Sequence, residues 1–163
     1  MIQNLKNLMI KLPEVSAHCD IPCKIYDPSA IQIPSLTIIR LIDIMNDCQK
    51  SKDSSSLDYQ NTIVRCVMRK EEESEKVKHE TRILWGDYFK KPLLEKFPET
   101  HELCHSIMLK ASACKQEVGR GEAEELLKLV NQLAKIFWAS KDIETKTVNC
   151  PYPPGEQTTY PVL

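Results

Sequence analysis

Apolar residues recur three and four positions apart along much of the chain, the spacing that places them on one face of an α-helix. The first such stretch runs from Leu36 to about Cys48 and is rich in isoleucine and leucine. The second covers about residues 58–88, the third follows Pro98, and the last covers about residues 122–141. The pattern therefore predicts four amphipathic helices.

Prolines shape the segment before the first helix. Pro22, Pro28 and Pro34 interrupt residues 18–34. Because proline lacks a backbone N–H and fixes φ, this segment is not expected to form a continuous helix. Ser35 is expected to cap the helix that follows.

Short connections join the later helices. Lys91–Pro92 is expected to end the second helix, and Gly119–Gly121 to divide the third from the fourth. The chain shows no convincing strand. We predict an all-α fold, an antiparallel four-helix bundle over residues 35–141, preceded by an irregular hook at 18–34. Residues 142–163 form a proline-rich tail expected to wrap a surface or stay mobile.

The second helix combines apolar positions with a dense run of charges. The charged run from Arg69 to Lys78 is expected to face solvent. The apolar positions are expected to be buried; they are Ile63, Val64, Val67, Met68, Val77, Ile83 and Leu84.

Charge and hydropathy exclude several functions. Lys and Arg number 22 against 23 for Asp and Glu, so no overall field favours nucleic acid or an anionic membrane. No stretch reaches the roughly 18 apolar residues of a membrane span. Residues 1–17 have apolar positions at helical spacing but too short a run for secretion, and Val15–Ala17 offers small side chains. We expect a leader that a processing protease removes before His18; a permanent N-terminal helix is the alternative.

Seven cysteines, an odd number, do not suggest a secreted disulfide framework. The cysteines of the helical region, Cys48, Cys66, Cys104 and Cys114, lie on or beside apolar faces and are expected to be buried thiols. This usage indicates a reducing compartment, and we expect a cytoplasmic protein.

The segment His18-Cys19-Asp20-Ile21-Pro22-Cys23 gathers metal-binding groups. Cleavage before His18 would place a free amine, an imidazole, the Cys19 amide nitrogen and two thiolates within a few residues. Amine, amide and two thiolates form a planar set that suits Ni(II) or Cu(II) rather than tetrahedral zinc, with the imidazole as axial ligand. A zinc site completed by His79, His101 or His105 and a Cys19–Cys23 disulfide are the competing interpretations.

The residues from His18 to Pro28 closely resemble the nickel-binding hook of nickel-containing superoxide dismutases. The block from Leu84 to Pro92, its continuation to Leu103, and Lys135-Ile136-Phe137-Trp138 resemble the same family in the same order. The resemblance implies a four-helix bundle assembled as a homohexamer. It also implies disproportionation of superoxide to O₂ and H₂O₂ through a Ni(III)/Ni(II) cycle, an antioxidant activity.

Site residues follow from the same resemblance. It implies that His18, Cys19 and Cys23 bind a single nickel ion in each chain. Tyr26 and Tyr88 would line the path of superoxide to the metal, and Lys90 would attract the anion. Asp20 would fix the hook by hydrogen bonds, Pro22 would hold its turn, and Lys91 would add positive charge.

The chain also departs from the family pattern. Lys24 stands where a glycine is usual; if that glycine has an unusual φ, Lys24 is strained. The Glu–Arg pair that commonly holds the axial imidazole corresponds here to Pro34 and about Glu73. These departures leave an alternative open: a helical-bundle protein that binds metal through a zinc or thiol site without catalysis.

Overall fold

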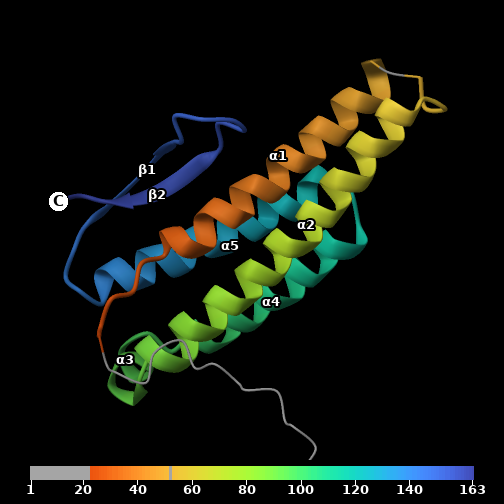
Figure 1. Cartoon of the computed structure of the whole chain (residues 1–163). Coiled ribbons are helices and arrows are strands. Elements are labelled where there is room, and N and C mark those ends of the chain that lie inside the picture. The colour runs from red at the N-terminus through yellow and green to blue at the C-terminus, as the bar shows by residue number, and fades with distance from the viewer. Residues whose placement is uncertain (1–22, 52) are drawn as a thin grey trace, which may run out of the picture.

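Four long helices form an antiparallel bundle in this computed structural model, which describes residues 23–51 and 53–163 (Figure 1). They are α1 (Ser29–Ser51), α2 (Leu57–Ile83), α4 (Thr100–Gln116) and α5 (Arg120–Ala139). Helix α1 packs against α2, α2 against α4, α4 against α5, and α5 against α1, so the helices close into a ring around one core. The predicted fold class is confirmed.

The first helix begins earlier than the prolines suggest. It starts at Ser29, whose N–H donates to the Asp27 Oδ1 at 2.8 Å, and not at Ser35. Pro34 lies inside the helix and is buried. The prediction was wrong because an N-terminal cap at Asp27 and burial of the flanking Ile31 and Leu36 outweigh the hydrogen bond that proline cannot donate.

The second helical stretch is not uniformly α-helical. The α-helix ends at Ile83 and a π-helical turn, η1 (Leu84–Tyr88), follows. Its wider hydrogen bond runs from the Phe89 N–H to the Leu84 carbonyl at 3.2 Å. A short helix that the sequence did not indicate, α3 (Lys91–Lys96), then begins with Pro92 in its first turn.

Apolar side chains from all four long helices fill the core. The four cysteines expected to be buried thiols are buried. Burial raises the pKa of the Cys104 thiol to about 12 and that of Cys114 to about 11. The largest fully buried apolar side chains are Phe89, Phe137, Ile31, Ile38, Ile39, Ile42, Ile107, Leu126, Leu133, Val77 and Val130.

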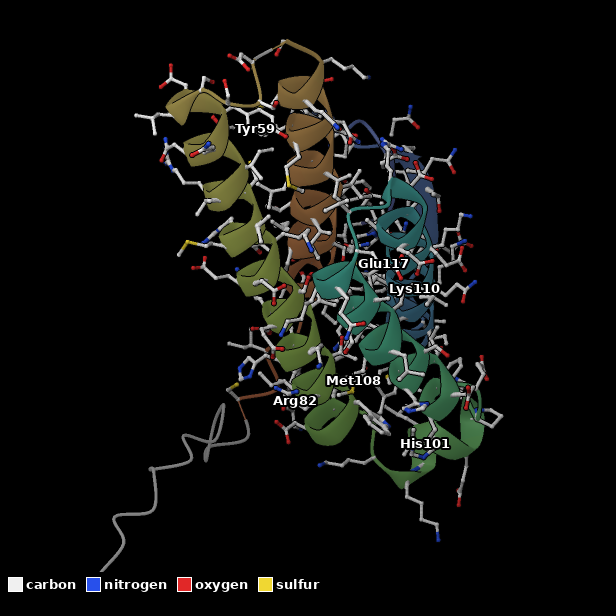
Figure 2. All side chains as sticks on the ribbon, turned by 90° about the vertical axis from the view of Figure 1, so that its right-hand side faces the viewer. Tyr59, Arg82, His101, Met108, Lys110 and Glu117 are labelled. Atoms are coloured by element: carbon white, nitrogen blue, oxygen red, sulfur yellow. The ribbon has the colours of Figure 1, made fainter. Side chains whose placement is uncertain are left out.

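The N-terminal half of α2 exposes side chains that the pattern assigned to the core. Val64 and Met68 are 56% and 59% exposed. The cause is that α2 extends past α4, so this part of α2 has no α4 beside it; Figure 2 shows Tyr59 well beyond Glu117, the residue after α4. The spacing of apolar residues predicts which face of a helix is buried, but it does not predict how far the neighbouring helix extends along that face.

The charged run on α2 is not wholly exposed either. Lys70 and Glu73 are buried. The Lys70 ammonium donates to the backbone carbonyls of Cys114 and Lys115, which lie in the last turn of α4 and have no partner within that helix. Burial lowers the pKa of Lys70. The expectation failed here because α4 offers backbone acceptors to a side chain of the neighbouring helix.

The tail folds into a β-hairpin. Strands β1 (Thr145–Asn149) and β2 (Gln157–Pro161) pair antiparallel with Thr147 opposite Thr159. In Figure 1 the hairpin lies alongside α5, with β2 nearer to the bundle than β1. Sequence reasoning missed these strands because each is only five residues long, although threonine favours strands; hydrogen bonds from Gln32 of α1 and Asn131 of α5 hold the hairpin in place.

Among residues 23–51 and 53–163, no helix combines the length and the apolar character that crossing a bilayer demands.

Candidate metal centre

Of the three predicted metal ligands, only Cys23 lies within the described structure. Cys23 is the first residue described; its thiol is exposed and forms no disulfide. His18 and Cys19, with Asp20 and Pro22 of the hook, lie outside the described residues. An accessible, uncombined thiol is what a metal ligand requires before loading, so Cys23 fits the predicted donor set.

Lys24 has a backbone conformation that favours glycine. Its φ is +59°, in the left-handed region. A side chain at this φ brings Cβ close to the following carbonyl and costs on the order of 1–2 kcal/mol. The conditional expectation of strain at Lys24 is therefore met: the residue directly after Cys23 has a left-handed conformation, which glycine adopts more easily than lysine.

Tyr26, two residues after Lys24, contacts Tyr88. Tyr26 precedes α1 and Tyr88 ends η1, and their ring centroids are 5.5 Å apart with the planes tilted by 56°. Both rings are partly buried against the core. The structure thus brings together two of the residues expected to line the path to the metal.

The π-helical turn aims Tyr88 into an aromatic cluster. Its ring centroid lies 4.7 Å from that of Phe137 and 5.1 Å from that of Phe89. Its Oη is 2.6 Å from the Ser140 Oγ, which in turn donates to the Phe137 carbonyl at 2.6 Å. Because that serine proton is used, the Tyr88 hydroxyl donates to Ser140.

Sequence reasoning missed two residues near Tyr88. Ser140 fixes its hydroxyl, and the Lys141 ammonium lies 5.1 Å from the centroids of both the Tyr88 and the Phe137 rings. Both follow directly on the Lys135–Trp138 block, but only the packing of α5 against η1 indicates that they reach the tyrosine. Lys141 adds a positive charge at this end of the bundle.

Lys90 folds back on the same turn. Its ammonium donates to the Gly86 carbonyl at 2.7 Å and is otherwise exposed. Lys91 is exposed and makes a long contact of 3.9 Å with Glu95. The two exposed lysines therefore present positive charge to solvent shortly after Tyr88 in the chain, although the protein as a whole carries a net charge of −1.

Helix α2 contains a glutamate–arginine ion pair, Glu73 with Arg69, although the family's pair corresponds to Pro34 and about Glu73. The Glu73 carboxylate, which is buried, accepts from Arg69 at 2.6 Å, one helical turn away. Pro34 has no side-chain donor or acceptor, so the usual pairing between α1 and α2 is absent at these described positions. The Arg69–Glu73 pair compensates the buried carboxylate within α2 itself.

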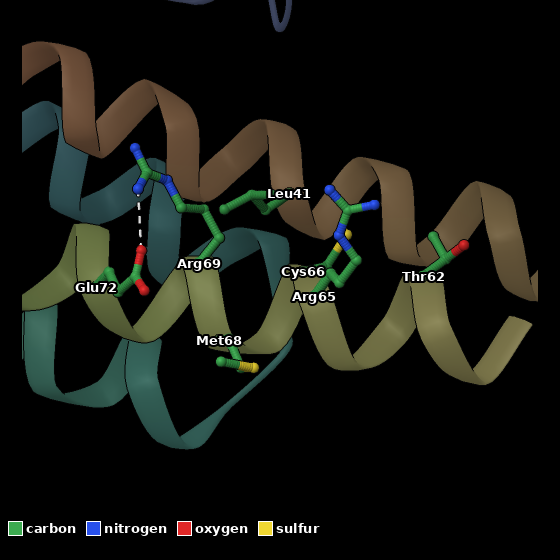
Figure 3. A pocket seen from close by; sticks show the side chains of 7 residues that line it. All are labelled: Leu41, Thr62, Arg65, Cys66, Met68, Arg69 and Glu72. Carbon is green, nitrogen blue, oxygen red and sulfur yellow. Dashed lines mark hydrogen bonds and ion pairs between the residues drawn. The ribbon is translucent and has the colours of Figure 1, made fainter. Parts of the chain in front are cut away.

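A larger hollow lies away from the tyrosine pair. A groove of about 460 Å³ between α1 and α2 is shown in Figure 3, with Leu41, Cys66 and Met68 on its walls and the Arg69–Glu72 ion pair at one end. It contains no predicted site residue. A smaller depression of about 220 Å³ lies beside Tyr26, between Ile25 and Glu80. Of the predicted site residues that the structure describes, only Tyr26 lines this depression.

The alternative interpretation has His79, His101 or His105 completing a zinc site with the hook residues. His101 accepts a hydrogen bond at its Nδ1 from the Trp85 Nε1 at 2.9 Å. Within residues 23–51 and 53–163, no three side chains of the His, Cys, Asp and Glu types come close enough to hold a metal ion. A zinc site that combines one of these histidines with His18 and Cys19 includes residues outside the described structure, so it stays an alternative prediction.

Comparison with known proteins settles the family. The sequence model of the family described as nickel-containing superoxide dismutase matches residues 13–141. The chain belongs to this family. The match includes the hook, the tyrosine pair and all four long helices, and it ends before the β-hairpin.

Individual members of the family agree. The nickel superoxide dismutases of Streptomyces seoulensis and Streptomyces coelicolor are each 33% identical over 137 residues, covering 84% of this chain and 98% of theirs. The native crystal structure of a nickel superoxide dismutase superposes with a TM-score of 0.68 at 32% identity, over 77% of this chain and 99% of that one. The chain thus spans almost the whole length of these relatives and adds a C-terminal extension.

Proposed function

We propose that this protein disproportionates superoxide to O₂ and H₂O₂ at a nickel ion held by His18, Cys19 and Cys23, after proteolysis has exposed the His18 amine. Membership of the family makes the protein a nickel superoxide dismutase by class. The observation that favours the detailed site is the meeting of Tyr26 and Tyr88, 5.5 Å apart, directly after the exposed Cys23 thiol.

The donor chemistry supports nickel. A planar set of two nitrogens and two thiolates suits Ni(II), and anionic amide and thiolate donors favour the higher oxidation state. When bound, nickel supplies the Ni(III)/Ni(II) couple that superoxide needs for both oxidation and reduction. The protein's task is then to hold the ligands, restrict access and deliver the anion and protons.

Tyr26 and Tyr88 are suited to restrict access. Their tilted rings occupy the surface between the start of α1 and the end of η1, so a large anion would have to displace packed aromatic side chains. The Tyr88 hydroxyl is held by Ser140 and does not rotate freely. A fixed hydroxyl beside the metal can order water and keep a proton source at a defined position.

Lys90 and Lys91 are suited to attract superoxide. They follow Tyr88 closely along the chain, and their ammonium groups make few compensating contacts among the described residues. A local positive field raises the encounter rate of a small anion even when net charge is near zero, and salt screens it. We infer that the reaction becomes slower at high ionic strength.

Assembly and location are further parts of the proposal. By analogy with the family, we propose a homohexamer in the cytoplasm, with residues 1–17 as a leader removed by a protease.

The decisive experiment compares chains that begin at Met1 and at His18, each loaded with nickel. We expect stoichiometric nickel, a rhombic Ni(III) resonance and superoxide disproportionation only in the chain that begins at His18. Cys23→Ser should lower the dismutation rate by more than about 100-fold, because a neutral alcohol does not replace a thiolate at nickel. The matched control is Cys150→Ser, which changes a buried thiol of the hairpin. Full activity in Cys23→Ser, or in the chain that retains Met1, would refute the proposal.

A second candidate function is metal binding without catalysis. The strained φ of Lys24 favours it, because strain beside Cys23 works against the tight turn that a planar ligand set needs. Nickel or zinc bound stoichiometrically to the processed chain, with no dismutation above that of the apo-protein, would identify this alternative.

A further inference from the structure

One edge of the C-terminal hairpin is hydrogen-bonded to the bundle through Gln157 and Thr159. Asn131 of α5 donates to the Gln157 carbonyl at 2.8 Å and accepts from the Thr159 N–H at 3.0 Å, as a neighbouring strand would. Gln32 of α1 donates to the Thr159 carbonyl at 2.8 Å and to the Asn131 Oδ1 at 3.1 Å. The next residue on this edge is Pro161, which has no N–H to satisfy. The inner edge of β2 is therefore closed.

The opposite edge, on β1, is open. The Cys150 N–H donates to the Glu156 carbonyl, and the Val162 N–H donates to the Glu144 carbonyl. These two bonds determine which residues of β1 form backbone hydrogen bonds with β2. By alternation, Lys146 and Val148 pair with β2, while the backbone groups of the odd-numbered residues point outward. Within the described residues, the backbone groups of Thr145, Thr147 and Asn149 have no hydrogen-bond partner on that side.

Of the features that usually protect a strand edge, β1 has a short length and one lysine, Lys146, and it lacks the others. The strand contains no proline, no bulge and no acidic residue, and four of its five residues are exposed. Its one large apolar side chain, Val148, is 42% exposed. Free edges of this kind are templates for pairing with another strand unless the chain blocks them.

We propose that the β1 edge pairs with the β1 edge of a second copy of this chain, antiparallel about a two-fold axis at Thr147, to form a continuous four-stranded sheet. Such pairing makes about six backbone hydrogen bonds, since each outward residue exchanges two with its counterpart. The surface lies beyond residues 13–141, so it is independent of the family match and of the proposed dismutase activity.

The sequence of β1 favours a second copy over an unrelated strand. With Thr147 opposite its own symmetry mate, Lys146 faces Val148 and Thr145 faces Asn149. No charged residue lies directly opposite a like charge, and a threonine pair, favourable across antiparallel strands, lies at the centre. The β1 edge is therefore complementary to the β1 edge of a second copy, as a two-fold symmetric contact between identical surfaces requires.

Amide hydrogen exchange tests the pairing residue by residue. In an isolated hairpin the amides of Lys146 and Val148 are protected and those of Thr145, Thr147 and Asn149 are not. We expect the outward amides to exchange more slowly, by about tenfold or more, as protein concentration rises, and to do so together. Exchange of all three at the unprotected rate at every concentration would overturn the proposal.

A pair of variants isolates the edge. Thr147→Pro removes an outward N–H that takes no part in the hairpin, whereas Thr147→Val keeps it. Both lose the contact of 3.1 Å between the Thr147 and Thr159 hydroxyl oxygens, so they are matched in the hairpin. We expect Thr147→Pro to abolish the protection of Thr145 and Asn149 and to lower the sedimentation coefficient, while Thr147→Val behaves as wild type.

Two results would contradict the second-copy partner. One is equal protection and sedimentation in Thr147→Pro and Thr147→Val, provided the Lys146 and Val148 amides show an intact hairpin in both. The other is protection that ignores this chain's concentration and appears only when an unrelated extended peptide is added, which would assign the edge to a different strand.

Discussion

The rings of Tyr26 and Tyr88 lie 5.5 Å apart although one precedes α1 and the other ends the π-helical turn after α2. The two tyrosines thereby connect the segment that carries Cys23 to the end of the bundle. The hydroxyl of Tyr88 is tied to Ser140 at the end of α5. Three elements far apart in sequence thus meet at the tyrosine pair.

Tyr88→Phe tests the role of this hydroxyl. The ring packing against Phe137 is kept, but the hydrogen bond to Ser140 is lost, so we expect the free energy of unfolding to fall by about 1 kcal/mol. Nickel content should stay stoichiometric because Tyr88 is not a ligand, while the dismutation rate falls. Tyr59→Phe, near the other end of α2, serves as the control. A Tyr88→Phe protein that loses nickel would show that the tyrosine holds the metal site together and does not only shape access to it.

Two substitutions at Lys24 separate strain from charge. Lys24→Gly removes the strain that a side chain causes at this positive φ. It should raise the free energy of unfolding of the nickel-loaded protein by up to about 1 kcal/mol. Lys24→Ala removes the same charge but keeps the strain, and should not stabilise. Denaturant unfolding measures both. If the two variants unfold alike, the backbone at residue 24 is not strained.

Thiol reactivity should divide the cysteines sharply. In the nickel-free protein we expect Cys23 to react with an alkylating reagent at neutral pH, while Cys104 and Cys114 stay unmodified until the chain unfolds, because burial holds their pKa values at about 12 and about 11. Nickel should protect Cys23. Mass spectrometry of the alkylated peptides gives the order. Early labelling of Cys104 would contradict the packed core.

The same two thiols predict a pH dependence of stability. Their pKa values are raised in the folded protein above the ordinary value of 9.0, so the folded state binds more protons than the unfolded state over this range. Stability from these thiols is therefore complete below about pH 9 and is lost as pH rises toward 12. Cys104→Ala should unfold more easily at neutral pH but show a shallower decline above pH 9. An unchanged slope would mean that Cys104 does not contribute.

Asn131→Leu tests the docking of the hairpin. It removes the hydrogen bonds to Gln157, Thr159 and Gln32 and leaves buried backbone groups without partners, so we expect a loss of about 2–4 kcal/mol. Limited proteolysis should then cut after Lys141 or Lys146, which wild type resists. Asn61→Leu, on an exposed position of α2, is the matched control. A hairpin that resists proteolysis in Asn131→Leu would show that other contacts, such as Arg120 with Glu156 at 2.6 Å, suffice.

The sequence by itself determined the bundle, the buried thiols and the proposed ligand set. Amphipathic periodicity and breaks at prolines and glycines are local signals, and short connections leave antiparallel packing as the simple outcome. The hook residues were also recognisable from sequence, because the ligands His18, Cys19 and Cys23 are close neighbours along the chain. Tyr26 and Tyr88 were named through resemblance to the family, and their contact was found only in the structure.

Only the tertiary structure decided what lies opposite each helix and strand. The exposure of Val64 and the burial of Lys70 both depend on where α4 ends, which the sequence of α2 does not contain. Likewise the threonine-rich tail forms strands because Gln32 and Asn131 supply hydrogen-bond partners for one edge. Such outcomes depend on groups brought together from distant parts of the chain, so local propensity does not predict them.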